Sequence, residues 1–366
     1  MSLAMKAPGK YVQGPGERNN LGLHTKKLGD RFFILCSKSG KKRFGDELSA
    51  SLIAQEKTVF FSEFGGEASK EEVFVKMDEV RVRDCDVIVG VGGGKVIDTA
   101  KAVAENLGGL PCVIVPTVAS NDAPCSGVAV LYNDAGVVVK AVLTRRNPDV
   151  VLVDTEIIAA APARLLSAGM GDALATWVEA RACQNSGAKT MARGRAPETV
   201  LMMAQLCQKL LFEYGGDALD AVKANTVTPA LEKVVEANIL LSGIGFESGG
   251  LAAAHAINDG FAQEPQTKGM YHGEKVAFGV LTQLVLEKAP EEELEEFLHF
   301  LKRVELPMTL AQLGVKTVDE GTLKKVAEAA CVPTQSTKNL SPEITADDVY
   351  HAILKADEIG RAYLLK

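Results

Sequence analysis

Seven short runs rich in β-branched and aromatic residues lie in the first 160 residues, and this pattern constrains the fold more than any other feature. Helical or loop segments separate the runs, and the segment EEVFVKMDEVRVRDC is long and charged enough to form a helix. Near-continuous apolar strands that alternate with helices are typical of a parallel sheet covered on both faces. The runs are RFFILCS (31–37), KTVFFSEF (57–64), DVIVGVG (86–92), LPCVIVP (110–116), GVAVLY (127–132), VVVKAVL (137–143) and DVVLVD (149–154).

The β signal ends near Pro162, and the rest of the chain has helical periodicity with Pro or Gly at the segment ends. A chain of 366 residues is long for a single core. We therefore expect an α/β domain with a doubly wound parallel sheet over residues 1–161 and an all-helical domain over residues 162–366. Within the first domain, runs 127–132 and 137–143 are predicted to form a hairpin added to the sheet, joined by Asn133, Asp134, Ala135 and Gly136.

The composition excludes several classes of function. Lys plus Arg number 40 and Asp plus Glu number 47, so the net charge of −7 and the absence of a long basic run argue against nucleic-acid binding. No uninterrupted apolar stretch is long enough to span a bilayer, and the start of the chain does not resemble a signal peptide. Seven scattered cysteines without CxxC spacing indicate reduced thiols in a cytoplasmic protein.

A glycine-rich turn follows one of the buried-type strands, in the segment DVIVGVGGGKVIDTAKAVAEN. The strand runs into Gly92, Gly93 and Gly94, and a helix is expected from about Lys95. Glycines let the backbone approach a ligand closely, and a helix N-terminus offers free N–H groups to a pyrophosphate. The spacing is neither the Rossmann fingerprint nor a P-loop, so this motif alone equally fits a tight turn without a ligand.

The next strand leads into a polar loop, VPTVASNDAPCSGVAVLY. Thr117, Ser120, Asp122 and Ser126 follow its carboxyl end, where open α/β sheets bind ligands. A plain polar loop has the same composition, but two consecutive strand ends with such loops favour a binding crevice.

Two histidines in the helical half, His255 and His272, are candidate metal ligands. His255 lies in the small-residue segment LAAAHAI, and His272 lies where a loop passes into a helix. Asp172, beside Gly171 in a run of small and apolar residues, is the candidate carboxylate, since burying an acid is costly unless it is paired or bound to a metal. No local spacing rule certifies the set, and a capping role for Asp172 is the alternative.

The motifs GVGGGKVIDTAKA, PTVASNDAPCS, GDALATWVEARAC, GFESGGLAAAHAI and YHGEKVAFG together resemble the glycerol dehydrogenases, a branch of the group III (iron-type) metal-dependent polyol and alcohol dehydrogenases. The resemblance extends from about Ala7 to the C-terminus. It implies an N-terminal dinucleotide-binding domain, a helical metal-binding domain with a metal in the cleft between the two, and a homo-oligomer, by family resemblance an octamer. It also implies that Asp172, His255 and His272 bind the metal and that Asp122 lies beside the polyol. The residues implied to line the cofactor are Ser37, Gly93, Gly94, Lys95, Asp98, Thr117, Ser120, Ser126, Val128 and Tyr132.

Three positions depart from the pattern of the family. Thr176 stands where iron-dependent relatives have a further histidine, which favours a three-ligand zinc site over other divalent metals. Ser37 stands where relatives have an acid that holds the adenosine ribose, and nearby lysines leave NADP open beside NAD. Asn258 replaces a second histidine after His255.

The expected reaction is transfer of hydride from a small vicinal polyol, glycerol first, to a nicotinamide cofactor, giving dihydroxyacetone. A divalent metal would stabilise the alkoxide, and two adjacent hydroxyls can chelate it. The alternatives are a dehydrogenase of another small alcohol or diol, and a lyase resembling dehydroquinate synthase. The lyase needs several basic residues facing the metal, where this sequence offers only Arg181, Lys268 and Lys275.

Overall fold

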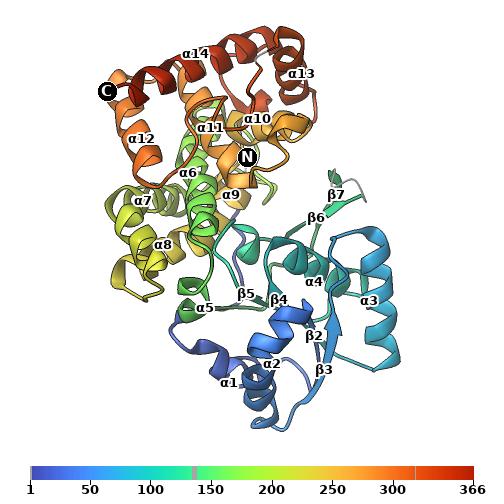
Figure 1. Ribbon diagram of the computed structural model, residues 1–366. Coiled ribbons are helices and arrows are strands. Elements are labelled where there is room, and N and C mark those ends of the chain that lie inside the picture. Colours follow the sequence, from blue (N-terminus) through green and yellow to red (C-terminus); the bar gives the residue numbers. More distant parts are fainter. Residues whose placement is uncertain (1, 134–137, 318) are drawn as a thin grey trace. The chain divides into compact units, whose positions relative to one another are not determined.

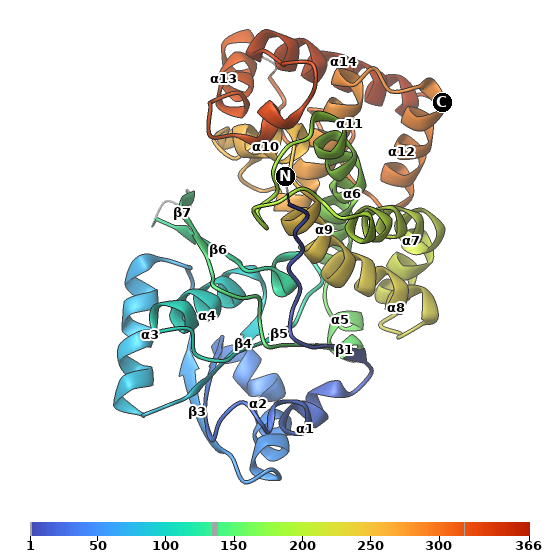
Figure 2. The same cartoon turned by 180° about the vertical axis from the view of Figure 1, so that it is seen from behind.

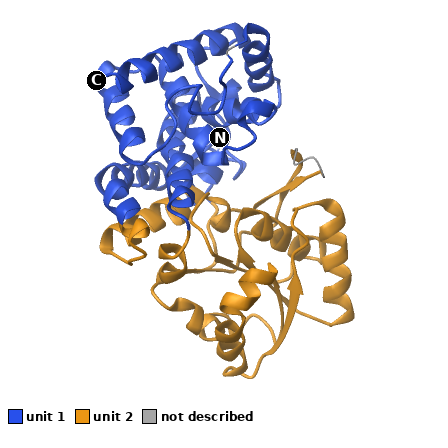
Figure 3. Cartoon of the chain, viewed as in Figure 1, with its two compact units in different colours: residues 1–5, 162–220, 244–366 blue, residues 6–161, 221–243 orange. Residues whose placement is uncertain are grey.

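The computed structural model describes residues 2–133, 138–317 and 319–366. These residues form two compact units (Figure 3). Unit 1 contains residues 1–5, 162–220 and 244–366, apart from the undescribed positions 1 and 318, and unit 2 contains residues 6–161 and 221–243, apart from 134–137. The domain bounds expected from the sequence, 1–161 and 162–366, stay a prediction about which segments fold independently.

Unit 2 is built on a six-stranded parallel sheet in the order β1-β8-β5-β4-β2-β3 (Figure 1). The strands are β1 (Tyr11–Gly14), β2 (Arg31–Cys36), β3 (Thr58–Glu63), β4 (Val87–Gly92), β5 (Cys112–Pro116) and β8 (Val150–Asp154). Apolar side chains such as Phe32, Val89 and Val113 are completely buried, as expected for a sheet covered on both faces. The predicted doubly wound α/β fold is confirmed, although the short β1, with the sequence YVQG, carried no strand signal.

The hairpin forms, but its predicted place in the sheet is wrong. Strands β6 (Val128–Tyr132) and β7 (Val138–Leu143) pair antiparallel in a separate two-stranded sheet. Both edges of β5, the strand that precedes the hairpin, are occupied by β4 and β8, so the hairpin has no edge to join there. The predicted connection through Asp134, Ala135 and Gly136 lies outside the described residues.

Helices cover the sheet, and serine side chains cap the N-termini of two of these helices. Ser37 Oγ accepts a hydrogen bond from Gly40 N at the start of α2, and Ser69 Oγ accepts one from Glu72 N at the start of α3. The helices of unit 2 are α1 (Leu21–Thr25), α2 (Lys38–Ile53), α3 (Lys70–Val82), α4 (Gly94–Asn106), α5 (Thr155–Ala159) and α8 (Pro229–Glu236), with the 3-10 helices η1 (Glu17–Asn20) and η2 (Ala123–Cys125) and the π-helix η3 (Ala237–Leu241).

Segment 221–243 is helical yet packs with the α/β unit. Helix α8 contacts α5 and β1. Gln13 Nε2 donates to the backbone oxygen of Glu232 at 2.8 Å, and Thr155 Oγ1 donates to the side-chain Oε1 of the same residue at 2.6 Å. These bonds attach a late segment of the chain to β1 and to the start of α5, which directly follows β8.

Unit 1 is helical in the described residues, and α10, α13 and α14 lie side by side in both views (Figure 1, Figure 2). Its helices are α6 (Ala163–Ser186), α7 (Glu198–Lys223), α9 (Ser242–Gly249), α10 (Ala253–Phe261), α11 (His272–Leu286), α12 (Glu291–Arg303), α13 (Glu320–Ala330) and α14 (Ala346–Leu364), with the 3-10 helices η4 (Pro265–Thr267) and η5 (Ser336–Asn339). The last residues of α7, 221–223, and the first residues of α9, 242–243, belong to unit 2. Among the described residues, no helix combines the length and apolar character needed to cross a membrane.

Candidate functional site

Two glycines bring α6 and α11 into backbone contact. A Cβ atom on Gly273 would overlap the backbone oxygen of Ala168, and one on Gly171 would overlap the oxygen of Gly273. Each glycine is the immediate neighbour of a predicted metal ligand, Asp172 on α6 and His272 on α11. The absence of two side chains therefore places these ligands beside each other.

The three predicted metal ligands converge within unit 1. Nε2 of His272 lies 3.1 Å from Asp172 Oδ1, and Nε2 of His255 lies 3.4 Å from the same oxygen. One ligand atom from each residue lies within 4.8 Å of the others. Asp172 is buried, His255 is half-buried and His272 is exposed, so the cluster has one open side.

The cluster is electrostatically coupled. Burial acts to raise the pKa of Asp172, but the charges and hydrogen bonds of His272 and His255 prevail and hold that pKa well below its usual range. Burial acts to lower the pKa of His255, but Glu179 and Asp172 prevail and raise that pKa well above its usual range. The site thus favours an ionised carboxylate facing positive charge.

Glu179, which sequence reasoning missed, orients His255. This completely buried carboxylate accepts hydrogen bonds from Nδ1 of His255 at 2.6 Å, from the backbone N of His255 at 3.0 Å and from Ala252 N at 2.8 Å. Because Nδ1 faces Glu179, Nε2 faces Asp172. One feature of the sequence could have identified Glu179: it lies seven residues, or two helical turns, after Asp172 and therefore on the same face of α6.

The donor set fits a divalent metal. Two imidazole nitrogens and one carboxylate oxygen are ligands that zinc prefers, and three protein ligands leave positions for substrate. Thr176, one turn after Asp172, is buried and offers no nitrogen. A histidine bound to metal usually donates its second N–H to a carboxylate, as His255 can to Glu179.

In unit 2, the glycine turn and the polar loop lie against each other. Thr117 N donates to Gly92 O at 3.0 Å, and a Cβ on Gly94 would lie 2.8 Å from Asn121 Nδ2. Gly93 precedes α4 without a capping side chain, so the first N–H groups of the helix are available to an anion.

The remaining predicted cofactor residues also belong to unit 2. Lys95 Nζ pairs with Glu67 Oε2 at 2.6 Å and lies 5.8 Å from the ring centre of Tyr132. Ser37 caps α2, as described above. The rest divide by burial into Asp98, Ser126 and Val128, which are buried, and Thr117 and Ser120, which are half-buried.

Lys101, a second residue that sequence reasoning missed, fastens the polar loop to α4. Its side chain is buried, and Nζ donates to the oxygens of Ala123 at 2.9 Å and of Val128. Asp98 Oδ1 lies 3.5 Å from the same nitrogen. Burial raises the pKa of Asp98 to about 6, against the opposing effect of Lys101. The loop is therefore held by a side chain and does not depend on a strand ladder.

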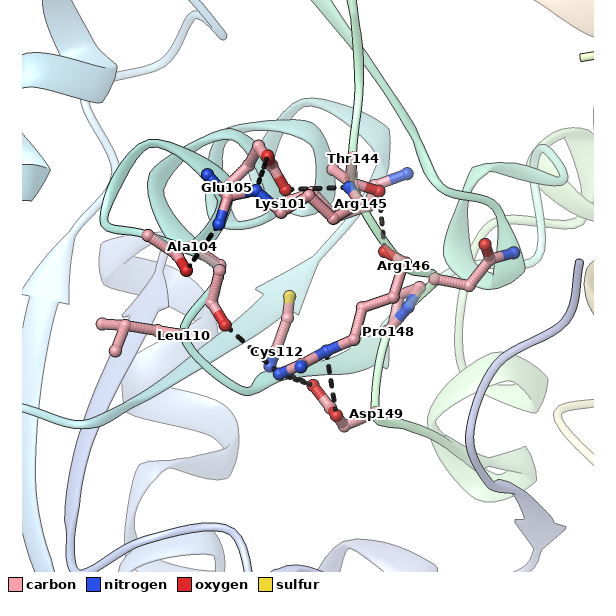
Figure 4. A pocket seen from close by; sticks show the side chains of 13 residues that line it. Lys101, Ala104, Glu105, Leu110, Cys112, Thr144, Arg145, Arg146, Pro148 and Asp149 are labelled. Atoms are coloured by element: carbon pink, nitrogen blue, oxygen red, sulfur yellow. Dashed lines mark hydrogen bonds and ion pairs between the residues drawn. The ribbon is translucent and has the colours of Figure 1, made fainter. Parts of the chain in front are cut away.

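A cavity of about 140 Å³ lies beside the C-terminal half of α4. It is lined by Lys101, Ala104 and Glu105 of that helix, by residues 108–110 and 112, and by residues 144–149 (Figure 4). Arg145 pairs with Glu105 at 3.0 Å and Arg146 pairs with Asp149 at 3.2 Å. These charged groups bind one another, and none of the predicted cofactor residues lines the cavity. It is not the predicted cofactor site.

The chain resembles proteins of known family over its whole length. The family model for iron-containing alcohol dehydrogenase matches residues 8–155. A glycerol dehydrogenase of Escherichia coli O6:H1 (strain CFT073) is 47% identical, with 100% of this chain and 99% of that protein covered. A glycerol dehydrogenase of Pseudomonas putida is 46% identical, with both chains covered completely. The crystal structure of a probable glycerol dehydrogenase from Sinorhizobium meliloti 1021 superposes with a TM-score of 0.93 at 40% identity, over 99% of this chain and 100% of that one.

The parallel sheet and a cluster of residues that could hold a metal fit a metal-dependent dehydrogenase that uses a nicotinamide cofactor. The chain belongs to the iron-containing alcohol dehydrogenase family, in its branch of polyol dehydrogenases. The family and the polyol dehydrogenase class predicted from the sequence are confirmed, and these relatives give no support to the lyase alternative. The roles assigned to individual residues stay predictions.

Proposed function

We propose that this enzyme oxidises glycerol to dihydroxyacetone with NAD, using zinc bound by Asp172, His255 and His272. The observation that carries the proposal is the convergence of two imidazoles and one buried carboxylate, with an exposed side left for substrate. The printed names of the full-length relatives favour glycerol among small polyols.

A bound divalent metal lowers the pKa of a coordinated hydroxyl, and the nicotinamide accepts the hydride. The protein supplies the geometry for this chemistry. Glu179 fixes the ring of His255, and the glycine pair fixes the spacing between Asp172 and His272. Asp122 is assigned the acceptor role for a hydrogen bond from a substrate hydroxyl.

The metal assignment is tested with His272→Ala. Removing an imidazole from an exposed position should abolish metal binding and activity while the helical core stays folded. Metal content by elemental analysis and folding by circular dichroism are measured together, with the exposed His299→Ala as control. Full turnover in His272→Ala would exclude the site. Since the ligands bind in deprotonated form, metal should also be released as pH falls.

The cofactor assignment is tested with Gly94→Val. A branched side chain at this position meets Asn121 and blocks the approach of a pyrophosphate to the start of α4. We expect cofactor affinity, measured by quenching of protein fluorescence, to collapse. Gly14→Val is the control, because the nearest atom to a Cβ there is 3.6 Å away. Unchanged cofactor binding in Gly94→Val would exclude this turn.

The choice between NAD and NADP depends on Ser37. Its side chain is neutral and caps α2, and Lys38, Lys41, Lys42 and Arg43 are exposed in the same helix. The family pattern favours NAD, whereas these basic side chains would tolerate the ribose 2′-phosphate of NADP. Comparing kcat/KM for the two cofactors decides the matter, and Ser37→Asp should reduce any NADP activity more than NAD activity.

The substrate assignment is tested by chelation and by Asp122. Glycerol and 1,2-propanediol should be turned over faster than 1-propanol, which offers the metal one oxygen. Asp122→Ala should lower kcat/KM for diols by a factor corresponding to about 1.5–3 kcal/mol, the value of a charge-assisted hydrogen bond, and leave 1-propanol nearly unchanged. Equal kcat/KM for glycerol and 1-propanol in the unmodified enzyme would contradict chelation.

The assembly and location are also proposals. A homo-oligomer, an octamer by family resemblance, is the expected state, and sedimentation velocity measures it directly. All seven cysteines are free thiols, which supports a reducing, cytoplasmic setting. Fractionation of the native cells tests the location.

A further inference from the structure

The loop that carries Asp122 contacts the only π-helix of the described residues. This helix, η3 (Ala237–Leu241), packs against the 3-10 helix η2 that follows Asp122. A π-helix has i→i+5 hydrogen bonds and therefore more residues per turn than an α-helix, and such turns are frequent at functional sites. The change in helical phase alters which side chains face the neighbouring loop.

Two side chains around η3 bind the loop. Asn238 Nδ2 donates to the backbone oxygen of Ala119 at 3.1 Å. Ser242 Oγ, immediately after the π-helix, donates to Oδ2 of Asp122 at 3.0 Å. Both donors are completely buried and Asp122 is 9% exposed, so these bonds are shielded from water.

Gly243 lets the helix come this close. A Cβ atom on Gly243 would lie 2.8 Å from Cβ of Cys125 and 2.9 Å from the backbone oxygen of Asp122. The adjacent pair Ser242 and Gly243 thus presents a hydroxyl to the carboxylate and no side chain to the backbone beside it.

The bond made by Ser242 joins a buried hydroxyl to a distant carboxylate, as does the bond from Thr155 to Glu232, and differs from the local bonds of two other buried threonines in unit 2. Thr25 and Thr99 each donate to the backbone oxygen four residues earlier in their own helix. Such bonds affect only the local helix. Ser242 donates across 120 residues to a carboxylate, and a hydrogen bond to a charged acceptor is the stronger kind.

We infer that Ser242 is a positioning residue that fixes the orientation of the Asp122 carboxylate and thereby sets the preference of the enzyme for diols over simple alcohols. The inference rests on the proposed role of Asp122 toward the polyol. Without the hydroxyl of Ser242, the Asp122 carboxylate loses a donor and gains rotational freedom. Forming a hydrogen bond to a substrate hydroxyl then costs the entropy of ordering that carboxylate.

The test compares Ser242→Ala, Asp122→Ala and the double variant in the purified metal-loaded enzyme. Ser242→Ala should lower kcat/KM for glycerol roughly tenfold and leave that for 1-propanol within about twofold. The double variant should be no worse than Asp122→Ala alone, because Ser242 acts through Asp122. Ser62→Ala, which removes another buried serine hydroxyl of unit 2, is the control for a purely structural effect. Ser242→Thr, which keeps a hydroxyl, should recover part of the glycerol preference.

The outcomes separate the inference from the proposed function. If Asp122→Ala leaves the ratio of glycerol to 1-propanol activity unchanged, the proposed role of Asp122 fails, and the inference fails with it. If Asp122→Ala changes that ratio but Ser242→Ala does not, only the inference is overturned. Equal losses for both alcohols in Ser242→Ala, or additive losses in the double variant, would also overturn it, since they indicate a structural role.

Discussion

A single buried carboxylate, Glu179, orients the ring of His255, a predicted metal ligand. It accepts hydrogen bonds from the ring and the backbone of His255 and from Ala252 N. An imidazole held in this way has a defined tautomer and a defined ring plane, both of which raise its affinity for metal.

Glu179→Gln should therefore weaken metal binding by about 10–100-fold while the ligands themselves remain. The measurement is competition with a chromogenic chelator, which reports metal affinity without reference to activity. Glu293→Gln is the control, because it alters an ion pair with Arg181, which lies on α6 as Glu179 does, and leaves His255 untouched. An unchanged metal affinity in Glu179→Gln would contradict the orienting role.

Asp98 should make stability depend on pH. Its pKa is raised by burial to about 6 in the folded state, above the ordinary value of 3.8. Between these pH values the folded state therefore binds more protons than the unfolded state. The contribution of Asp98 to stability is fully present below about pH 4 and is lost as the pH rises through 6. Each unit of pKa shift corresponds to about 1.4 kcal/mol, so the free energy of unfolding should fall by about 3 kcal/mol over this pH range.

Asp98→Asn should remove this pH dependence. Urea unfolding of both proteins at pH 4 to 7, without cofactor and with chelator present, measures the difference in unfolding free energy. We expect Asp98→Asn to gain stability relative to the unmodified protein as pH increases. A constant difference across this range would show that Asp98 does not titrate there.

The sequence predicted residues whose chemistry is visible locally and missed those that act through distant partners. The two histidines and the glycine turn have distinctive neighbours in the chain. Glu179 lies 76 residues from His255. Ser242 lies 120 residues from Asp122. Nothing near either residue in the sequence identifies its partner.

At the scale of elements, the predicted metal site depends on the contact between α6 and α11. Gly171 and Gly273 let the two backbones touch, and each glycine adjoins a predicted ligand. Arg164 Nε on α6 also donates to Glu274 Oε1 at 2.6 Å, in the first turn of α11. Packing and charge together fix the start of α11, where His272 lies.

Gly273→Ala should separate Asp172 from His272 although neither ligand is changed. The added methyl group overlaps the oxygen of Ala168, a backbone atom that cannot rotate away. We expect loss of metal affinity and a lower Tm. Gly269→Ala is the control, since a Cβ there meets no atom within 4 Å. Normal metal affinity in Gly273→Ala would contradict the argument.

The elements were predictable where one residue pattern sufficed. Strands β2, β4 and β5 are continuous apolar runs, so their type could be read directly. Strand β1 is four half-buried residues and has no such run. The site of the β6–β7 hairpin depends on which sheet edges are occupied, and this is a property of the folded sheet that the segment itself does not encode.

At the scale of the whole chain, the composition of a segment indicates its secondary structure but does not indicate which unit the segment packs with. Segment 221–243 is helical, so its sequence resembles the helical half in which it lies. In the structure it packs with residues 6–161. The predicted division at 161/162 takes no account of this segment.

The last prediction concerns the independent stability of the α/β unit. A fragment of residues 6–161 lacks α8, whose Leu231, Val234 and Val235 are completely buried. Their burial stabilises a fold by about 1.5–3 kcal/mol per side chain, so the fragment should lose roughly 5–9 kcal/mol of stability or fail to fold. Joining residues 221–243 to it through a flexible linker should restore cooperative unfolding in guanidinium. The same fusion with Leu231→Asp should behave like the shorter fragment. If residues 6–161 unfold at the same denaturant concentration with and without the segment, the division at 161/162 describes the folding unit better.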